Sequence, residues 1–322
     1  MATAIEFQHV KKAFNGKTVI LDLNLKIKQG EFFVLVGTSG SGKTTSLKMI
    51  NRLESLTAGK ILVNDQDSSQ IPVRTLRWDM GYVLQQIALF PTMTVAQNIA
   101  VIPEMKGTTK KEISATIDEL LNEVGLDPKV YRDRMPSELS GGEQQRIGIL
   151  RALAAQPSIV LMDEPFSALD PLSRQQLQDL VLRLHERYHN TIVFVTHDMN
   201  EALKLGHRIG IMRTGELLQV DTPQQIAQHP ANEFVREFFG ASLAQNVYDI
   251  YLGRVGLVQG YLPTAPTVAA ERIQTVDYQD TLRTGFSALA SHDYLAVNES
   301  GQLQGYLDRQ TVMTYLSEHE ND

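Results

Sequence analysis

The stretch EFFVLVGTSGSGKTTSLKMI, residues 31–50, contains the strongest structural signal in the chain. It begins with a short continuous apolar run, which is typical of a strand buried on both faces. A glycine-rich loop follows, and KTTSLKMINRLE predicts a helix after that loop. Gly37, Gly42, Lys43 and Thr44 fit the phosphate-loop pattern G-x4-G-K-[ST] at every fixed position. The sequence therefore predicts a phosphate-binding loop between a buried strand and a helix.

The residue types in this loop suit a phosphate group. Glycines let backbone N–H groups crowd around phosphate oxygens, and the following helix adds its positive N-terminal end. We expect Lys43 to reach the β- and γ-phosphates of a nucleotide and the Thr44 hydroxyl to ligate Mg²⁺. The expected nucleotide-binding residues of the loop are Gly37, Thr38, Ser39, Gly40, Ser41, Gly42, Lys43, Thr44 and Thr45.

Two further apolar runs, SIVLMDEP (158–165) and TIVFVTHD (191–198), predict buried strands, with a helix-like stretch at 172–188 between them. Buried strands that alternate with helices imply a mostly parallel sheet with helices on both faces. Residues 3–30 instead alternate apolar and polar side chains, which predicts two strands. An Asn15–Gly16 turn joins these two strands as in a hairpin.

Between Pro91 and Pro157 the pattern changes from strand to helix. KKEISATIDELLNEVG (110–125) has apolar residues at helical spacing, and no buried strand is expected before Ile159. We therefore expect a helical subdomain inserted into an α/β core.

Polar side chains end the later apolar runs. Asp163 and Glu164 close one run, and His197 closes the next. Carboxyl ends of parallel strands meet at the sheet edge where α/β proteins bind ligands. Adjacent strand residues point to opposite sides, so we expect Asp163 to hold the Mg²⁺ sphere and Glu164 to orient or deprotonate the attacking water. His197 is expected at the same edge. Gln85 is expected to reach Mg²⁺ or water through its amide, with Gln86 as the competing candidate.

The composition of the whole chain excludes several classes of protein. The 322 residues include no cysteine, which rules out disulfides, thiolate metal sites and a cysteine nucleophile. No apolar run reaches the roughly 18 residues of a membrane-spanning helix, and the start does not resemble a secretory signal. A formal net charge of −7 argues against broad nucleic-acid binding. A soluble cytoplasmic protein is the expectation.

Together these motifs resemble the ATP-binding-cassette (ABC) ATPases over roughly residues 3–240. Glu143 departs from the family, because many members have glutamine at that position. The resemblance implies an α/β ABC-type P-loop NTPase with an inserted helical subdomain that uses ATP and Mg²⁺, with Asp163 in the second shell of the metal. The matching segments are 37–45 as Walker A, Gln85 as the Q-loop, LSGGEQQR (139–146) as the signature motif, IVLMDE (159–164) as Walker B, SALD (167–170) as the D-loop, and His197 as the switch histidine.

The resemblance also implies that a second copy of the chain completes the site. Cassettes of this family pair head to tail with two ATP molecules between them. Ser140, Gly141 and Gly142 of one copy would then face the γ-phosphate that Lys43 of the other copy holds. A hydroxyl and glycine N–H groups at a helix start suit this contact. Phe14 lies where the family stacks adenine, so it joins the expected nucleotide contacts.

Within the superfamily, the chain resembles a stand-alone importer ATPase. It has one cassette, without the long heptad insertion of repair ATPases or the second cassette of ribosomal factors. Residues 82–107 and 134–174 are most similar to the quaternary-amine branch, whose members power uptake of glycine betaine, proline betaine, carnitine or choline. Residues 89–100 resemble the region that receives short helices from the membrane partner.

This branch implies a set of partners and a location. The partners are a second copy of the chain, integral membrane permease subunits and, indirectly, an extracellular solute-binding protein or permease-fused binding domain. The location is the cytoplasm, peripheral on the inner face of the membrane, and no nucleic-acid partner is expected. Two alternatives stay open: an importer ATPase for another small solute such as an amino acid, and a non-transport ABC regulator that works on nucleic acid or ribosomes. The acidic tail and the single cassette disfavour the second alternative.

The tail from Ala241 differs in composition, with four arginines, no lysines and ten acidic residues, a net charge of −6. Residues 292–316 predict strand, tight turn, strand and helix and resemble the second half of a CBS motif, and residues 272–290 resemble the first half. The predicted division is an ABC ATPase domain at 1–240, a linker at 241–265 and a single CBS-like regulatory domain, small and α+β, at 266–322.

One CBS motif cannot form a pair within the chain, so we expect the tails to pair across the ATPase dimer. Asp308 is a candidate contact for a nucleotide ribose, although a solvated surface role is the favoured interpretation. The negative charge of the tail argues against sensing of ionic strength through an anionic membrane.

Overall fold

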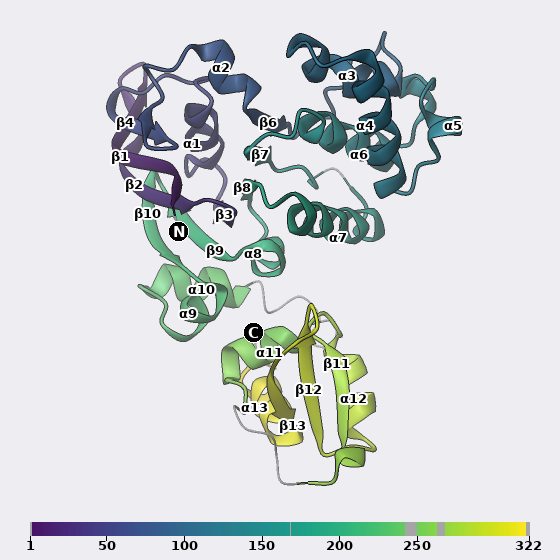
Figure 1. Cartoon of the computed structure of the whole chain (residues 1–322). Helices are drawn as coiled ribbons and strands as arrows, with labels where there is room; N and C mark the ends of the chain where they lie inside the picture. Colours follow the sequence, from purple (N-terminus) through teal and green to yellow (C-terminus); the bar gives the residue numbers. More distant parts are fainter. Residues whose placement is uncertain (1, 168, 242–249, 263–267, 320–322) are drawn as a thin grey trace. The chain divides into compact units, whose positions relative to one another are not determined.

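The computed structural model describes residues 2–167, 169–241, 250–262 and 268–319 (Figure 1). The chain forms two compact units, Met1–Val220 and Asp221–Asp322, which we call the N-terminal and C-terminal units. The strands that begin in the N-terminal unit are β1 (Thr3–Phe14), β2 (Lys17–Lys28), β3 (Phe32–Gly37), β4 (Ala58–Val63), β5 (Gln66–Asp67), β6 (Met80–Val83), β7 (Ile159–Asp163), β8 (Thr191–Thr196), β9 (Arg208–Arg213) and β10 (Glu216–Asp221). Its helices are α1 (Lys43–Ile50), α2 (Val73–Trp78), α3 (Val95–Met105), α4 (Lys110–Glu123), α5 (Pro128–Tyr131), η1 (Pro136–Glu138), α6 (Gly141–Leu153), α7 (Pro171–Tyr188) and α8 (Met199–Leu205).

The larger sheet of the N-terminal unit has the strand order β10-β9-β3-β8-β7-β6. β3 pairs in parallel with both β8 and β9, and β7 pairs in parallel with β8 and β6. Every residue of β3, β7 and β8 is buried. The continuous apolar runs therefore form central parallel strands, as predicted.

A second, antiparallel sheet has the order β2-β1-β4-β5. β1 and β2 form the predicted hairpin, in which Phe14 pairs with Lys17 and the turn residues Asn15 and Gly16 have φ values of 48° and 81°. One hydrophobic core joins the two sheets and α1, because Ile5, Leu35 and Leu47 belong to the same buried cluster.

The predicted helical subdomain is confirmed. Residues 84–158, all of which the structure describes, contain helices and no strand. Figure 1 shows α3–α6 gathered beside the edge strand β6, and α3 packs against both α4 and α6. Thr94 and Thr109 cap α3 and α4 through capping boxes. In each box the threonine side chain accepts from a backbone N–H of the first turn, and a side chain of that turn accepts from the threonine N–H.

The C-terminal unit contains a three-stranded sheet of order β11-β12-β13. β11 and β12 run parallel across α12, whereas β12 and β13 form an antiparallel hairpin whose turn residues Ser300 and Gly301 have positive φ. The predicted strand–turn–strand–helix order of residues 292–316 is thus present. The elements of this unit are α9 (Pro223–Gln228), α10 (Glu233–Ala241), α11 (Leu252–Gln259), η3 (Ala270–Arg272), β11 (Ile273–Asp277), α12 (Leu282–Leu289), β12 (Tyr294–Glu299), β13 (Gln302–Asp308) and α13 (Arg309–His319).

The structure differs from the predicted linker at 241–265. Residues 242–249 and 263–265 lie outside the described residues, but 252–259 form helix α11, which packs against α9 and α13 and buries Leu252 and Val255. α9 and α10 also cluster with this unit, so the compact N-terminal unit ends at Val220 instead of 240. Gly253 and Gly256 of α11 allow the rings of Tyr278 and Tyr261 to approach the helix closely.

Asp308 has a local structural contact. Its Oδ1 accepts hydrogen bonds from the backbone N–H and the hydroxyl of Thr311, both at 2.7 Å. The half-buried carboxylate therefore satisfies groups at the start of α13, which accounts for an acid at this position without a ligand.

No described helix is long and apolar enough to cross a lipid bilayer.

Replacing Gly256 with alanine is expected to destabilise the C-terminal unit. A Cβ at this position would lie 2.1 Å from the Tyr261 ring, so the ring or the helix must shift, at a cost of about 1–3 kcal/mol. Gly240→Ala in α10 is the matched control, because a Cβ there meets nothing within 4 Å. Thermal denaturation and limited proteolysis of the full-length variants measure the effect, and equal stability of the two variants would contradict this account of α11.

Candidate active site

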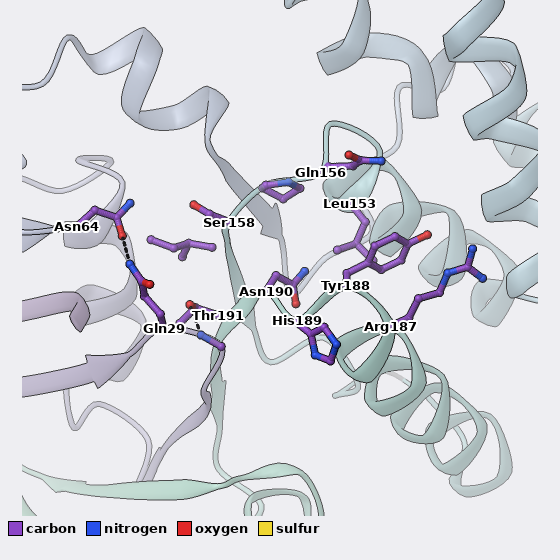
Figure 2. Close-up of a pocket in the computed structure, with 13 residues that line it drawn as sticks. Gln29, Asn64, Leu153, Gln156, Ser158, Arg187, Tyr188, His189, Asn190 and Thr191 are labelled. Atoms are coloured by element: carbon purple, nitrogen blue, oxygen red, sulfur yellow. Dashed lines mark hydrogen bonds between the residues drawn. The ribbon is translucent and has the colours of Figure 1, made fainter. Parts of the chain in front are cut away.

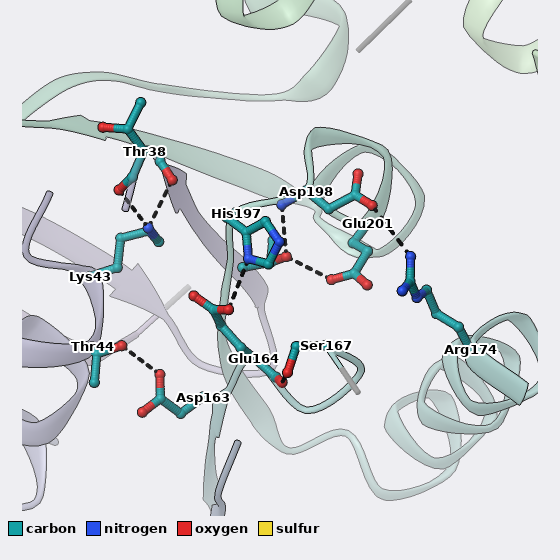
Figure 3. Close-up of polar contacts among 12 residues, drawn as sticks. Thr38, Lys43, Thr44, Asp163, Glu164, Ser167, Arg174, His197, Asp198 and Glu201 are labelled. Carbon is teal, nitrogen blue, oxygen red and sulfur yellow. Dashed lines mark hydrogen bonds and ion pairs between the residues drawn. The ribbon is translucent and has the colours of Figure 1, made fainter. Parts of the chain in front are cut away.

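The predicted chemical groups gather where β3, β7 and β8 end. The phosphate loop follows β3 and leads into α1, Glu164 follows β7, and His197 follows β8. Parallel pairing keeps these three ends level, with Val36 beside Thr196. Figure 3 shows the resulting cluster of side chains at this edge of the sheet. The arrangement is that expected for ligand binding at the carboxyl edge of an α/β sheet.

The backbone of the phosphate loop requires glycine at Gly42. Its φ is 102°, in the left-handed region, and a Cβ would lie 2.4 Å from the Ile20 methyl group. Gly42 immediately precedes the first residue of α1, so the free N–H groups of the helix start face the loop. The loop therefore offers backbone donors to an anion.

Lys43 lies inside the loop and is only 4% exposed. Its Nζ donates hydrogen bonds to the carbonyl oxygens of Gly37 (2.8 Å) and Thr38 (3.0 Å). Burial lowers the pKa of Lys43, while the charges of Glu164 and Asp163 act in the opposite direction. The ammonium is thus held where the phosphates of a nucleotide are expected.

Asp163 is joined to the phosphate loop through Thr44, whose Oγ1 donates to Asp163 Oδ1 at 2.7 Å. The carboxylate is 3% exposed, and burial raises its pKa. On its other side, the Tyr82 hydroxyl lies 3.5 Å from Asp163 Oδ2. Tyr82 was not singled out from the sequence, although it stands on β6, directly beside β7 in the sheet. Burial and Asp163 raise the pKa of Tyr82, so its hydroxyl stays protonated and able to donate.

Glu164 contacts His197 directly, with 2.8 Å between Oε2 of the glutamate and Nδ1 of the imidazole. Glu164 has a φ of 43°, which is uncommon for a residue other than glycine. Its N–H donates to the carbonyl of Val195 at 2.9 Å, so pairing with β8 holds this backbone in place. Such backbone strain clusters at functional sites.

A small cavity of about 40 Å³ lies behind this pair. It is lined by Glu164, Ser167, Arg174, Thr196, His197, Asp198 and Glu201. Thr196, Asp198 and Glu201 were missed from the sequence. The available signal was weak, because it consisted of polar residues on both sides of His197 and an acid in the first turn of α8.

The signature segment forms the start of α6. Ser140 is the N-cap residue, and its Oγ accepts from Glu143 N–H while Glu143 Oε2 accepts from Ser140 N–H. The Tyr131 hydroxyl also donates to Glu143, and these bonds lower the pKa of that carboxyl. Glu143, which stands where many family members have glutamine, therefore completes a capping box, as glutamine would. Further along α6, the buried Gln145 Nε2 donates to Pro165 O at 2.7 Å, one residue after Glu164.

Gln85 and Phe14 are exposed, whereas the predicted D-loop is joined to the cluster through Ser167. Gln85 follows β6 and is exposed. Phe14 is 39% exposed beside the hairpin turn, where the Lys12 ammonium lies 4.3 Å from its ring centroid. In the predicted D-loop, Ser167 Oγ donates to Glu164 O and Asp170 caps α7, whereas residue 168 lies outside the described residues.

Larger pockets lie elsewhere in the N-terminal unit, two of them along the parallel sheet. One of about 590 Å³ lies where β7 and β8 begin, and Figure 2 shows the hydrogen bond between its residues Gln29 and Asn64. In the same pocket, the Gly30 N–H donates to Thr191 Oγ1. Its position at the amino ends of the strands separates it from the phosphate loop. The other, about 450 Å³, is lined mainly by apolar groups that include Trp78, and it runs beside the segment of Gln85.

The exposed apolar side chains in this second pocket are Leu53, Leu84 and Phe90, which are 49%, 36% and 45% exposed. We call this pocket the apolar groove. Its floor is formed by β6 and its far wall by α3 and α6 of the helical subdomain. Neighbouring exposed apolar groups of this kind mark interaction sites more often than lone ones do.

Comparisons with known proteins agree with this geometry. Residues 20–167 match the ABC transporter family. The chain is 44% identical over 310 residues to the choline transport ATP-binding protein of Bacillus subtilis, covering 96% of this chain and 79% of that protein. It is 49% identical over 238 residues to the ATP-binding protein of the glycine betaine uptake system of Escherichia coli, covering 74% of this chain and 77% of that one.

A solved structure extends the comparison to the fold. An ATP-binding cassette, solved as a dimer in a post-hydrolysis state bound to ADP and Pi, superposes with a TM-score of 0.61 and 32% identity, covering 68% of this chain and 98% of that one. The matched cassette thus corresponds to the ABC portion of the present chain. The chain belongs to the ABC transporter family, among the ATP-binding subunits of glycine betaine, carnitine and choline importers.

Proposed function

We propose that this chain hydrolyses ATP to drive import of a quaternary amine such as glycine betaine, carnitine or choline through a separate membrane permease. The observation that carries the proposal is the contact between Glu164 and His197, at the same sheet edge as Lys43 and the Thr44–Asp163 pair. Relatives that match most of the chain are named for choline and glycine betaine transport, which supports the class of solute.

In this proposal, the chain's own residues divide the work at the ATP site. The phosphate loop and Lys43 bind the phosphates, and Glu164 orients the attacking water and accepts its proton. His197 holds the Glu164 carboxylate through Nδ1, and Gln85 approaches the γ-phosphate end of the site. Thr44 and Asp163 provide oxygen atoms of the kind that Mg²⁺ prefers, and they already lie within hydrogen-bond distance of each other. Bound Mg²⁺ would neutralise charge on the phosphate oxygens.

A second copy of the chain is proposed to complete each ATP site. Ser140 and Gly141 are exposed at the start of α6, where the positive end of the helix is free to meet an anion. The related cassette solved as a dimer supports this assembly. In such a dimer, each copy binds ATP with its own Lys43 and presents Ser140 to the ATP of its partner.

The apolar groove is proposed to receive a short helix of the permease. Its apolar lining suits the hydrophobic face of such a helix, and Arg151 offers a cation at its side. Because Gln85 and Glu164 follow the neighbouring strands β6 and β7, a helix bound there lies close to the catalytic edge. The chain would then work at the cytoplasmic face of the membrane.

The C-terminal unit is proposed to be a CBS-like regulatory domain that pairs with its counterpart in the second copy. The order β11-α12-β12-β13-α13 supports this proposal, because it matches the strand and helix order expected for one CBS motif. The sheet β11-β12-β13 exposes the side chains of Thr275 and Gln304. The face that carries them is available for pairing with the second copy.

Glu164→Gln is expected to keep ATP binding and to lower hydrolysis by about 10²–10⁴-fold, because the amide cannot accept the proton of the attacking water. ATP affinity and phosphate release, measured on the full-length protein, separate the two effects. Exposed Glu216→Gln serves as the control and should hydrolyse ATP at the native rate. Turnover at the native rate by Glu164→Gln would remove Glu164 from the catalytic role.

Ser140→Arg and Lys43→Ala are each expected to be inactive alone, yet active when mixed. A mixed dimer has one intact site, formed by Lys43 of the first variant and Ser140 of the second. The mixture should recover on the order of a quarter of the native rate, because half of randomly formed pairs are mixed and each has one intact site. ATP binding by Ser140→Arg alone should be retained. No recovery on mixing, with both variants folded, contradicts a site shared between two chains.

The class of solute is tested in vesicles that contain this chain with the permease encoded beside it. ATP supplied to the side that holds the chain should drive uptake of labelled glycine betaine, carnitine or choline. The Glu164→Gln variant, which binds ATP without turnover, provides the background. Uptake of an amino acid with none of these quaternary amines would reassign the solute and leave the ATPase unaffected.

A further inference from the structure

The loop that carries His197 is held by a chain of hydrogen bonds on the side away from the phosphate loop. Thr196 Oγ1 donates to Glu201 Oε2 at 2.7 Å and accepts from Asp198 N–H at 3.0 Å. Thr196 and Asp198 are the two neighbours of His197 in the sequence. One hydroxyl therefore joins both ends of the turn that presents the imidazole, and Glu201 fixes that hydroxyl. Figure 3 shows Glu201 beside this turn with His197 and Asp198.

Glu201 and Thr196 are buried, at 6% and 2% exposed. Burial raises the pKa of Glu201, and the bond from Thr196 acts against that rise. A buried carboxyl group is unfavourable unless it makes hydrogen bonds, and an apolar residue would fill the first turn of α8 at lower cost. The presence of an acid at this position points to a role for its hydrogen bond.

The turn is also held at Asp198. Asp198 Oδ1 accepts from Asn200 N–H at 2.8 Å and so caps α8, while Oδ2 lies 4.0 Å from an Arg174 guanidinium nitrogen. On the opposite side of the turn, the His197 side chain is 59% exposed, and its Nδ1 is bonded to Glu164. The orientation of this exposed imidazole therefore depends on the backbone beneath it.

The cavity of about 40 Å³ lies between this turn and the Glu164 segment. A void beside a loop lets the loop shift without displacing packed atoms. Release of the Thr196–Glu201 bond would let the backbone at His197 relax toward that space. A displacement of about 1 Å at a group that orients a reactant is enough to slow an enzyme by on the order of 10²-fold.

We propose that Glu201 is a positioning residue for ATP hydrolysis, which acts through Thr196 to hold the turn at His197 and so keeps the imidazole against Glu164. The inference rests on the proposed function, because it gives importance to the His197–Glu164 contact. Glu201 touches neither ATP nor the attacking water in this scheme. Its effect is on turnover, and binding of ATP by the phosphate loop is independent of it.

The test uses paired variants of the full-length protein. Glu201→Ala and Thr196→Val remove the hydrogen bond from either side, whereas Glu201→Gln and Thr196→Ser each retain an oxygen that can make it. Glu31→Ala is the matched control, because Glu31 is an equally buried carboxylate, 6% exposed, which contacts Lys28 N–H and Arg208 at the other end of β3. The kcat and KM for ATP are measured for each variant.

Removal of the bond is expected to lower kcat by about tenfold or more with KM changed less than about twofold. The bond-retaining variants and Glu31→Ala should stay near the native kcat. NMR spectra of histidine-labelled protein provide a direct readout, since the His197 signal is identified by its loss in His197→Ala. That signal should shift in Glu201→Ala and Thr196→Val and stay in place in Glu31→Ala.

Two results would overturn the inference: a native kcat in Glu201→Ala, whatever its KM, or a lowered kcat with the His197 signal unmoved. If Glu201→Ala does not fold, Thr196→Val decides the question, because it is nearly isosteric. Failure of the proposed function is separate. A native kcat in His197→Ala removes His197 from hydrolysis, whereas an inactive His197→Ala beside a fully active Thr196→Val removes only the positioning role.

Discussion

Parallel hydrogen bonding between β3, β8 and β7 is the constraint on which the proposed ATP site depends. The register places Val36 beside Thr196 and Asp163 beside Val195, so three strands end level at one edge. Each strand is buried along its whole length and cannot slip by one residue without turning apolar side chains to the opposite face. Residues far apart in the sequence, Lys43, Glu164 and His197, are brought together by this register, and the loops after the strands need only short paths to present them.

Much of this arrangement follows from local sequence. The phosphate loop, the Asn15–Gly16 hairpin and the helical subdomain between Pro91 and Pro157 were predicted because each depends on near neighbours in the chain. The capping of α3 by Thr94 is equally local. The joint position of the catalytic groups was also predictable, since parallel strands present their carboxyl ends together.

Other features depend on contacts that the sequence does not display. Tyr82 and Glu201 reach the site through burial between separate elements, and neither belongs to a motif. The predicted linker at 241–265 includes helix α11. The glycines of α11 mark where Tyr278 and Tyr261 pack against the helix, which is a tertiary contact between residues with few local signals.

The capping of α6 also leaves the Ser140 hydroxyl able to donate a hydrogen bond. Its Oγ accepts from Glu143 N–H through one lone pair, which does not use the hydroxyl proton. Because the Glu143 carboxylate is engaged by Ser140 N–H and the Tyr131 hydroxyl, it is directed toward the protein and leaves that donor unopposed. The helix start therefore suits an anion, because exposed backbone N–H groups and the Ser140 hydroxyl can donate to it.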